Sequence, residues 1–163
     1  MLIAIVADTH LPRGERRLPQ QCLAHLRSAE LILHAGDISA VSALDELTAL
    51  GPPVLAVHGN VDEQALVERL PAQLELEIDR IRIAMTHDAG PARGRLSRLR
   101  RRFPRADAVV FGHSHIPLLE SAAGFQIFNP GSPTDRRRQR RHTMGLARVQ
   151  DGALDFEHVK LGS

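Results

Sequence analysis

Three short apolar segments in the first third of the chain each end in polar residues, and this pattern constrains the fold most. The segments span residues 2–7, 30–34 and 54–57. Uninterrupted apolar runs of this length predict strands buried on both faces, which are typical of parallel sheets. The residues at their ends are Asp8-Thr9-His10, Gly36-Asp37 and Gly59-Asn60. Because ligands bind beyond the carboxyl ends of parallel strands, we expect these polar groups to meet at one edge of a sheet.

The rest of the chain alternates between helical and strand patterns. Apolar residues recur at helical spacing over residues 18–28 and 39–50, and a basic helix is expected over residues 93–103. Period-two alternation on both sides of Asp79 predicts a hairpin with one solvent-facing side. The strands predicted after the third apolar segment are residues 73–78, 80–85, 108–111, 117–121, 125–128, 143–149 and 153–160. A parallel first half followed by hairpins predicts an α/β fold of two packed sheets with helices outside.

Composition narrows the class of protein. A chain of 163 residues that is 43% hydrophobic fits one globular domain, so residues 1–163 are predicted to form a single domain. The single cysteine, Cys22, excludes an internal disulfide framework and a cysteine zinc cluster. We expect a cytoplasmic protein without a membrane span, because no apolar run approaches about 20 residues and no basic leader opens the sequence.

Two later strands add histidines to the polar strand ends. His87 follows the strand at 80–85, and Gly112-His113-Ser114-His115 follows the strand at 108–111. Each motif alone is weak, but all five fall after predicted strands, and their side chains suit divalent Mn, Fe or Zn. Without a metal, such a cluster would leave several polar groups unpaired. The seven candidate ligands are Asp8, His10, Asp37, Asn60, His87, His113 and His115.

These motifs, in this order and spacing, resemble the five motifs of the calcineurin-like metallophosphoesterases. Gly59-Asn60-Val61-Asp62 and Asn129-Pro130-Gly131-Ser132-Pro133 are similar to the compact bacterial and archaeal phosphodiesterase branch of that family. The resemblance covers about residues 1–135. It implies a four-layer αββα sandwich of two mixed sheets flanked by helices, with a dinuclear metal site.

The resemblance also implies a division of the ligands. Asp8, His10 and His115 would hold one metal, Asn60, His87 and His113 the other, and Asp37 would bridge both. The expected ions are two Mn²⁺, with Fe²⁺, Zn²⁺, Ni²⁺ or Co²⁺ as alternatives. Two such ions outweigh the charge of two carboxylates, so the site would attract phosphate. A hydroxide that bridges the metals would be the nucleophile.

One departure from the family pattern concerns the general acid. Many members have a histidine directly after the Gly-Asn pair, where it assists the leaving group, and this chain has Val61. A metal-bound water, His58 or Asp62 could supply the proton instead. Asp88 follows His87 where glycine is common, and either orients that histidine or faces solvent.

Basic residues are concentrated in the second half of the chain. Residues 93–141 carry 12 arginines and three acidic residues. The run that contains Arg136 and Arg137 follows Asn129-Pro130-Gly131-Ser132, which is expected to turn near the site. A run of like charges is usually a solvated loop. Guanidinium groups also bind phosphate well, so Arg136 and Arg137 are candidate substrate contacts.

The sequence leaves three functions open. The first is metal-dependent hydrolysis of a small phosphodiester, with a phosphomonoester as the less favoured substrate, a preference that comes from the resemblance. The second is a catalytically silent scaffold, like the retromer subunit of the same family, although that branch tends to lose ligands such as Asn60. The third is a nuclease, which is less favoured because aromatic residues make up only 3% of the chain. Self-association into a homo-oligomer is a further possibility.

Overall fold

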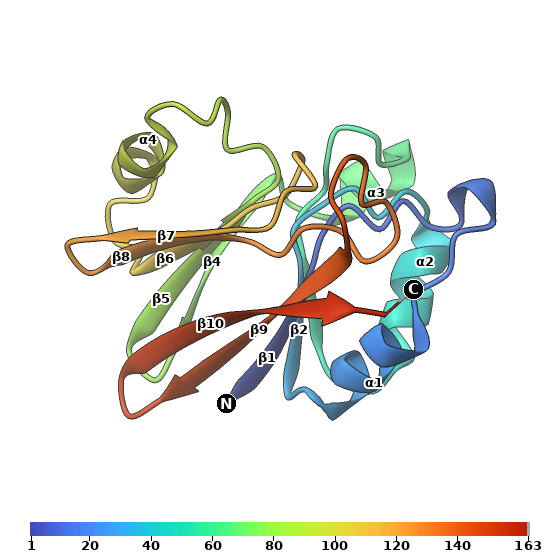
Figure 1. Cartoon of the computed structure of the whole chain (residues 1–163), viewed down its shortest axis with the longest axis horizontal. Helices are drawn as coiled ribbons and strands as arrows, with labels where there is room; N and C mark the ends of the chain where they lie inside the picture. The colour runs from blue at the N-terminus through green and yellow to red at the C-terminus, as the bar shows by residue number, and fades with distance from the viewer. Residues whose placement is uncertain (163) are drawn as a thin grey trace.

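The computed structural model describes residues 1–162 and contains two five-stranded sheets that pack face to face (Figure 1). The first sheet has the order β10-β9-β1-β2-β3. Its strands are β1 (Leu2–Val6), β2 (Leu31–His34), β3 (Val54–Ala56), β9 (His142–Gln150) and β10 (Ala153–Leu161). The first three strands run parallel, as the apolar segments predict, and β9 pairs antiparallel with β1.

The second sheet has the order β4-β5-β6-β8-β7. Its strands are β4 (Gln73–Ile78), β5 (Ile81–Thr86), β6 (Ala108–Val110), β7 (Leu118–Ala122) and β8 (Phe125–Asn129). The three central strands run parallel, and β4 and β7 are antiparallel edges. The predicted hairpin is confirmed, since Asp79 and Arg80 form its turn with positive φ.

Four α-helices occur within residues 1–162 and lie outside the paired sheets (Figure 1). They are α1 (Gln20–Ser28), α2 (Val41–Thr48), α3 (Gln64–Arg69) and α4 (Arg95–Arg102). Helices α1 and α2 cover the outer face of the first sheet, and α4 covers the second. The predicted α/β fold of two mixed sheets flanked by helices is confirmed. No helix among residues 1–162 is both long and apolar enough to cross a membrane.

Alternation along β1 explains the layers. Ile3 and Ile5 belong to the core cluster between the sheets, which also contains Phe128 of β8. Ala4 belongs to the cluster on the other face of β1, where Leu26 of α1 packs. Successive side chains of a strand point to opposite faces, so an uninterrupted apolar segment supplies both layers at once.

Several element boundaries differ from the sequence expectation. Helix α1 begins at Gln20 rather than at residue 18, because Pro19 has an extended ψ of 148°. Helix α2 begins at Val41, since Ser39 has a φ of 96°. The six-residue α3 and a 3-10 turn at Arg13–Glu15 were not expected, because neither is long enough to show a period.

Candidate metal centre

The loops that follow β1 and β2 are joined by backbone hydrogen bonds. The N–H of Asp8 donates to the carbonyl of Gly36 at 3.0 Å, and the N–H of His10 donates to the carbonyl of Asp37 at 3.0 Å. The two loops therefore continue the parallel pairing of their strands beyond the sheet. This arrangement holds Asp8, His10 and Asp37 side by side.

Five of the seven candidate ligands have a left-handed backbone. Their φ angles are 54° at Asp8, 48° at His10, 58° at Asp37, 72° at His113 and 61° at His115. This conformation is uncommon for residues with a side chain and costs roughly 1 kcal/mol or more each. Positive φ also occurs in ordinary turns such as Asp79-Arg80, but its concentration at mostly buried candidate ligands fits a functional site.

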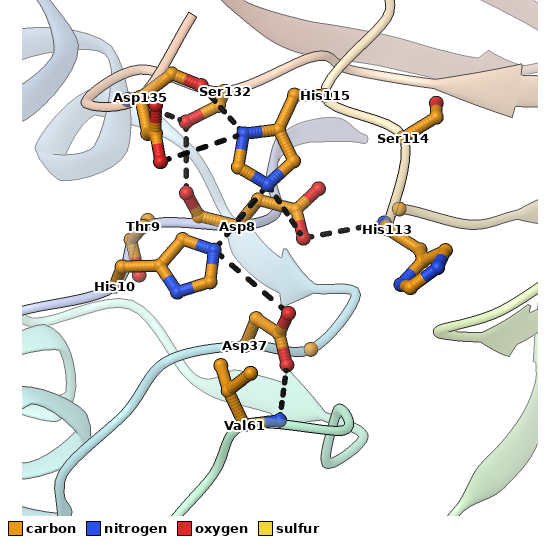
Figure 2. Close-up of polar contacts among 12 residues, drawn as sticks. Asp8, Thr9, His10, Asp37, Val61, His113, Ser114, His115, Ser132 and Asp135 are labelled. Atoms are coloured by element: carbon orange, nitrogen blue, oxygen red, sulfur yellow. Dashed lines mark hydrogen bonds and ion pairs between the residues drawn. The ribbon is translucent and has the colours of Figure 1, made fainter. Parts of the chain in front are cut away.

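The first candidate metal group consists of Asp8, His10 and His115, all buried. The Nε2 atoms of the two histidines lie 3.3 Å apart, and the Nε2 of His115 lies 3.7 Å from Oδ1 of Asp8 (Figure 2). Within residues 1–162, Oδ2 of Asp8 and Nδ1 of His10 are buried without a hydrogen-bond partner. Orphaned polar atoms of this kind fit a site that binds a cation.

The second candidate metal group consists of Asp37, His87 and the exposed His113. Asn60 belongs with them, since its Oδ1 lies 2.9 Å from Nε2 of His87 and 3.1 Å from Nδ1 of His113. The Nδ1 of His87 donates to the carbonyl of Ala35 at 2.8 Å. The lone pair of Nε2 in neutral His87 then faces the oxygens of Asn60 and Asp37. A proton or a metal cation at this point relieves the repulsion between Nε2 of His87 and the Asp37 carboxylate.

Asp37 connects the two groups. Its Oδ2 lies 3.2 Å from Nε2 of His87 and 3.8 Å from Nε2 of His10. Its Oδ1 accepts the backbone N–H of Val61 at 3.0 Å, which fixes the orientation of the carboxylate (Figure 2). Each group combines residues from both sheets, because β1 and β2 belong to the first sheet and β5 and β6 to the second.

Burial controls the ionisation of the first group. It raises the pKa of Asp8 to about 7, although the nearby His87 opposes the shift. It lowers the pKa of His115 to about 4 and also lowers the pKa of His10. The metal-free group therefore favours neutral forms, with lone pairs available on the imidazoles.

Mutual attraction controls the ionisation of the second group. Burial alone would raise the pKa of Asp37, but the hydrogen bond and charge of His87 outweigh it and lower this pKa. Burial likewise works against the charged form of His87, and the hydrogen bond to Asp37 with the charges of both aspartates raises its pKa. The pair of Asp37 and His87 thus favours a positive charge beside the Asp37 carboxylate.

The segment that follows β8 holds the first group in place through hydrogen bonds. Ser132 Oγ donates to the carbonyl of Asp8 at 2.8 Å, and Thr134 Oγ1 donates to the carbonyl of Thr9 at 2.6 Å. The carbonyl of Asp135 accepts the Nδ1–H of His115, which directs Nε2 toward Asp8 (Figure 2). The expected position of Asn129-Pro130-Gly131-Ser132 beside the site agrees with this geometry. Thr134 and Asp135 were not expected, because Thr134 contacts a residue 125 positions away and Asp135 acts through its backbone carbonyl, which residue type does not indicate.

Two glycines leave room for the candidate ligands. A Cβ atom added to Gly59 would lie 2.0 Å from Oδ1 of Asp37. A Cβ atom added to Gly36 would lie 2.5 Å from Nδ1 of His87. The Gly-Asp and Gly-Asn motifs therefore need glycine for space, and Gly36 also has a left-handed φ of 99°.

The residues considered for proton transfer and for orienting His87 have different placements. The Asp62 carboxylate accepts backbone N–H groups from Gly59 at 2.6 Å, Ser39 at 2.7 Å and Asp37 at 3.2 Å. It ties loops together, which contradicts its use as a free general acid. His58 is half-buried, with Nδ1 3.3 Å from the carbonyl of Gly59. The Asp88 carboxylate accepts the N–H of Gly90, so Ala35 rather than Asp88 orients His87.

The two candidate arginines, Arg136 and Arg137, have different surroundings in the structure. The charge of Arg137 affects the pKa values of Asp8, His10 and His115, although burial has a larger effect on each of them. The positive charge of Arg137 therefore acts on the first group. Arg136 instead donates to the carbonyl of Gln139 at 2.6 Å and lines a separate pocket.

Comparison with known proteins agrees with this geometry. A probable metallophosphoesterase of Methanothermobacter thermautotrophicus is 34% identical over 165 residues, which cover 100% of this chain and 94% of that protein. A phosphodiesterase of Methanocaldococcus jannaschii is 22% identical over 147 residues, covering 80% of this chain and 83% of that protein. The zinc complex of Vps29 from Entamoeba histolytica has the same fold, with a TM-score of 0.79, 23% identity, and coverage of 98% of this chain and 99% of that chain.

The sequence pattern described as the calcineurin-like phosphoesterase superfamily domain matches residues 1–152. That range contains all seven candidate ligands. The predicted family is therefore confirmed, and the chain belongs to the calcineurin-like phosphoesterase superfamily.

Proposed function

We propose that this chain hydrolyses phosphodiesters with two divalent cations held at the carboxyl ends of the strands. The observation that carries the proposal is the position of Asp37. Its Oδ2 lies within 3.8 Å of a histidine from each candidate metal group. A carboxylate placed between two sets of nitrogen and oxygen donors suits a pair of ions about 3.5–4 Å apart.

The residues divide between the two ions as follows in this proposal. Asp8, His10 and His115 would hold one, and Asn60, His87 and His113 the other, with Asp37 shared. Bound divalent cations supply Lewis acidity that activates water and neutralises charge on the phosphate. The mixed nitrogen and oxygen donors suit Mn²⁺ best in our proposal, and Fe²⁺, Zn²⁺, Ni²⁺ and Co²⁺ have the same donor preference.

Substrate would approach from the side of His113 and Val61. His113 is exposed, and Val61 has 42% of its surface exposed, whereas Asp8 and His115 are buried. Arg137 adds positive charge near the first group, where it would attract the phosphate. In the reaction, oxygen from water bonds to phosphorus and the bond from phosphorus to the leaving oxygen breaks. The products are a phosphomonoester and an alcohol, which takes up one proton, while the second proton of the water goes to the phosphomonoester or to solvent.

The preference for diesters is supported by a relative, and the surroundings of Val61 bear on the leaving group. One relative is described as a phosphodiesterase, and the relation extends over 80% of this chain. Val61 cannot donate a proton to the leaving oxygen, and the Asp62 carboxylate is held by three backbone N–H groups. His58 and solvent water are then the remaining proton sources we propose. Esters with good leaving groups should react fastest because they need this proton least.

The scaffold and nuclease alternatives have less support. A scaffold does not require seven metal-ligating side chains to converge, or five of them to keep a strained backbone. A nuclease needs an extended surface that follows a nucleic acid, and the arginines of α4 lie on the outside of the second sheet (Figure 1). We therefore propose a small phosphodiester as the substrate.

Hydrolysis of bis-p-nitrophenyl phosphate, compared with p-nitrophenyl phosphate, tests this proposal. We expect turnover with Mn²⁺ that is faster on the diester, stops with EDTA and falls at least about a hundredfold in Asp37→Asn. Asp151→Asn removes a similar carboxylate from the exposed β9–β10 turn and should retain activity. Folded wild-type protein without turnover on either ester with any of the five metals would overturn the proposal.

A further inference from the structure

A second concave surface lies next to the candidate metal centre and is strongly basic. It has a volume of about 880 Å³ and is formed by the start of α1, the loop before β9 and the end of β10. Five arginines line it, and within residues 1–162 no acidic side chain does. We call it the arginine pocket; its arginines are Arg16, Arg17, Arg136, Arg140 and Arg141.

Most of this charge is not neutralised by the protein. Arg16 forms an ion pair with Asp135 at 3.1 Å, and Arg136 donates to a backbone carbonyl. Arg17, Arg140 and Arg141 have no side-chain hydrogen bond or ion pair with any residue from 1 to 162. Arginines that line one hollow without carboxylate partners favour an anion with several oxygens, which can accept hydrogen bonds from more than one guanidinium group.

Other polar side chains of the pocket are hydrogen-bond donors as well. Gln20, Gln21 and His142 also line it, and each can donate a hydrogen bond. Gln20 and Gln21 open helix α1, whose first turn has no side-chain cap and no acidic residue. The wall as a whole is therefore suited to phosphate rather than to a cation or an apolar group.

The arginine pocket and the candidate metal centre share one segment of chain. Pro133 and Thr134 line the pocket, while the next residue, Asp135, accepts a hydrogen bond from His115. Thr134 also donates to the carbonyl of Thr9, between two candidate ligands. A ligand with phosphates at both positions would thus lie across this one segment.

We infer that the arginine pocket binds a further phosphate group of the substrate. The inference rests on the proposed function and narrows its substrate class to small diesters that carry at least one additional phosphate. The metal centre would hold the scissile phosphate, and the pocket would hold the other. Selection then depends on total phosphate charge as well as on the diester bond.

A matched series of esters tests this inference. Thymidine 5′-(p-nitrophenyl phosphate) contains only the scissile diester, and the same compound with a 3′-phosphate adds one phosphate. A third ester carries one more thymidine phosphate. The series therefore places an additional phosphate at two different distances from the scissile one. The wild type should show a kcat/KM at least about tenfold higher on one of the two extended esters, since each charge-assisted contact contributes about tenfold or more.

Two double variants that each remove two positive charges distinguish binding in the pocket from an effect of net charge. Arg140→Ala/Arg141→Ala should reduce the preference for the extended esters to about one. Arg101→Ala/Arg105→Ala removes two exposed arginines outside the pocket and should keep the wild-type preference. Binding of pyrophosphate to EDTA-treated protein, measured by calorimetry, should weaken at least about tenfold in the pocket variant only.

The outcomes distinguish the inference from the proposed function. Turnover of the shortest ester reports the proposed function alone. Equal kcat/KM across the series in an active wild type overturns the inference, as does a preference that both double variants lower equally. If the chain hydrolyses none of the esters, pyrophosphate affinity that is the same in wild type and pocket variant also overturns it.

Discussion

The carboxylate of Asp37 lies 3.2 Å from Nε2 of His87, although the two residues follow strands of different sheets. Asp37 comes after β2 and His87 after β5. Each candidate metal group repeats this arrangement, with at least one residue from each sheet. A bound cation would therefore join the two halves of the sandwich, and metal binding should affect stability as well as activity.

Removing metal should lower the melting temperature. At a Mn²⁺ concentration one hundred times its Kd, binding adds about 2.7 kcal/mol to the free energy of unfolding. For a chain of this size that corresponds to roughly 5–10 °C. Differential scanning calorimetry with Mn²⁺ and with EDTA measures the shift, which should shrink in Asp37→Asn and persist in Asp151→Asn. An equal shift in both variants would contradict a site that includes Asp37.

Gly59→Ala should abolish metal-dependent activity while the chain still folds. The added methyl group would lie 2.0 Å from Oδ1 and 2.5 Å from the backbone N of Asp37, so that this carboxylate and its loop must move. Gly124→Ala is the control, because it has a left-handed φ of 78° but no atom within 4 Å of the new methyl group. It should cost about 1 kcal/mol of stability and retain turnover. Comparing Mn²⁺ affinity and melting temperature for both variants checks this, and Gly59→Ala with wild-type affinity would refute it.

His34 should make the metal-free chain less stable in acid. Burial lowers the pKa of His34 to about 3 from an ordinary 6.5, and its ring bonds to Thr9 and to the N–H of Gly36. Between these values the unfolded chain binds a proton that the folded chain excludes. The free energy of unfolding therefore falls as the pH drops from about 6.5 toward 3, by up to about 1.4 kcal/mol per pH unit.

Urea unfolding of wild type and His34→Gln in EDTA isolates this contribution. Asp8 has its pKa raised to about 7 and contributes with the opposite sign, since the folded chain then binds the extra proton. The difference between the two proteins removes that effect. In this range the free energy of unfolding of His34→Gln should depend on pH less steeply than that of the wild type, by up to about 1.4 kcal/mol per pH unit. Parallel curves for the two proteins would show that His34 is not buried as a neutral ring.

The fold and the candidate ligands could be predicted because both depend on short-range patterns. Ile3 and Ala4 alternate between two apolar layers, so the first strand is a continuous apolar run that any reader can recognise. Asp8 follows it directly, and parallel topology then places it at the same edge as Asp37. Helix α3 could not be predicted because six residues show no reliable period.

Many of the contacts that the sequence did not reveal join residues far apart in the chain. Arg17 and Arg140 line one pocket because β9 returns beside β1, a pairing that no local pattern specifies. Asp62 has the chemistry of a general acid in sequence, and only the structure shows its carboxylate bound to three N–H groups. The residues that form the candidate site could thus be predicted, whereas the role of a polar residue depends on hydrogen-bond partners that only the structure shows.

The most direct test of the dinuclear site is an anomalous difference map from a crystal grown with Mn²⁺. The account predicts two peaks about 3.5–4 Å apart, with Asp37 between them. One peak should lie by Asp8, His10 and His115, and the other by Asn60, His87 and His113. A single peak, or two peaks that do not share Asp37, would contradict it.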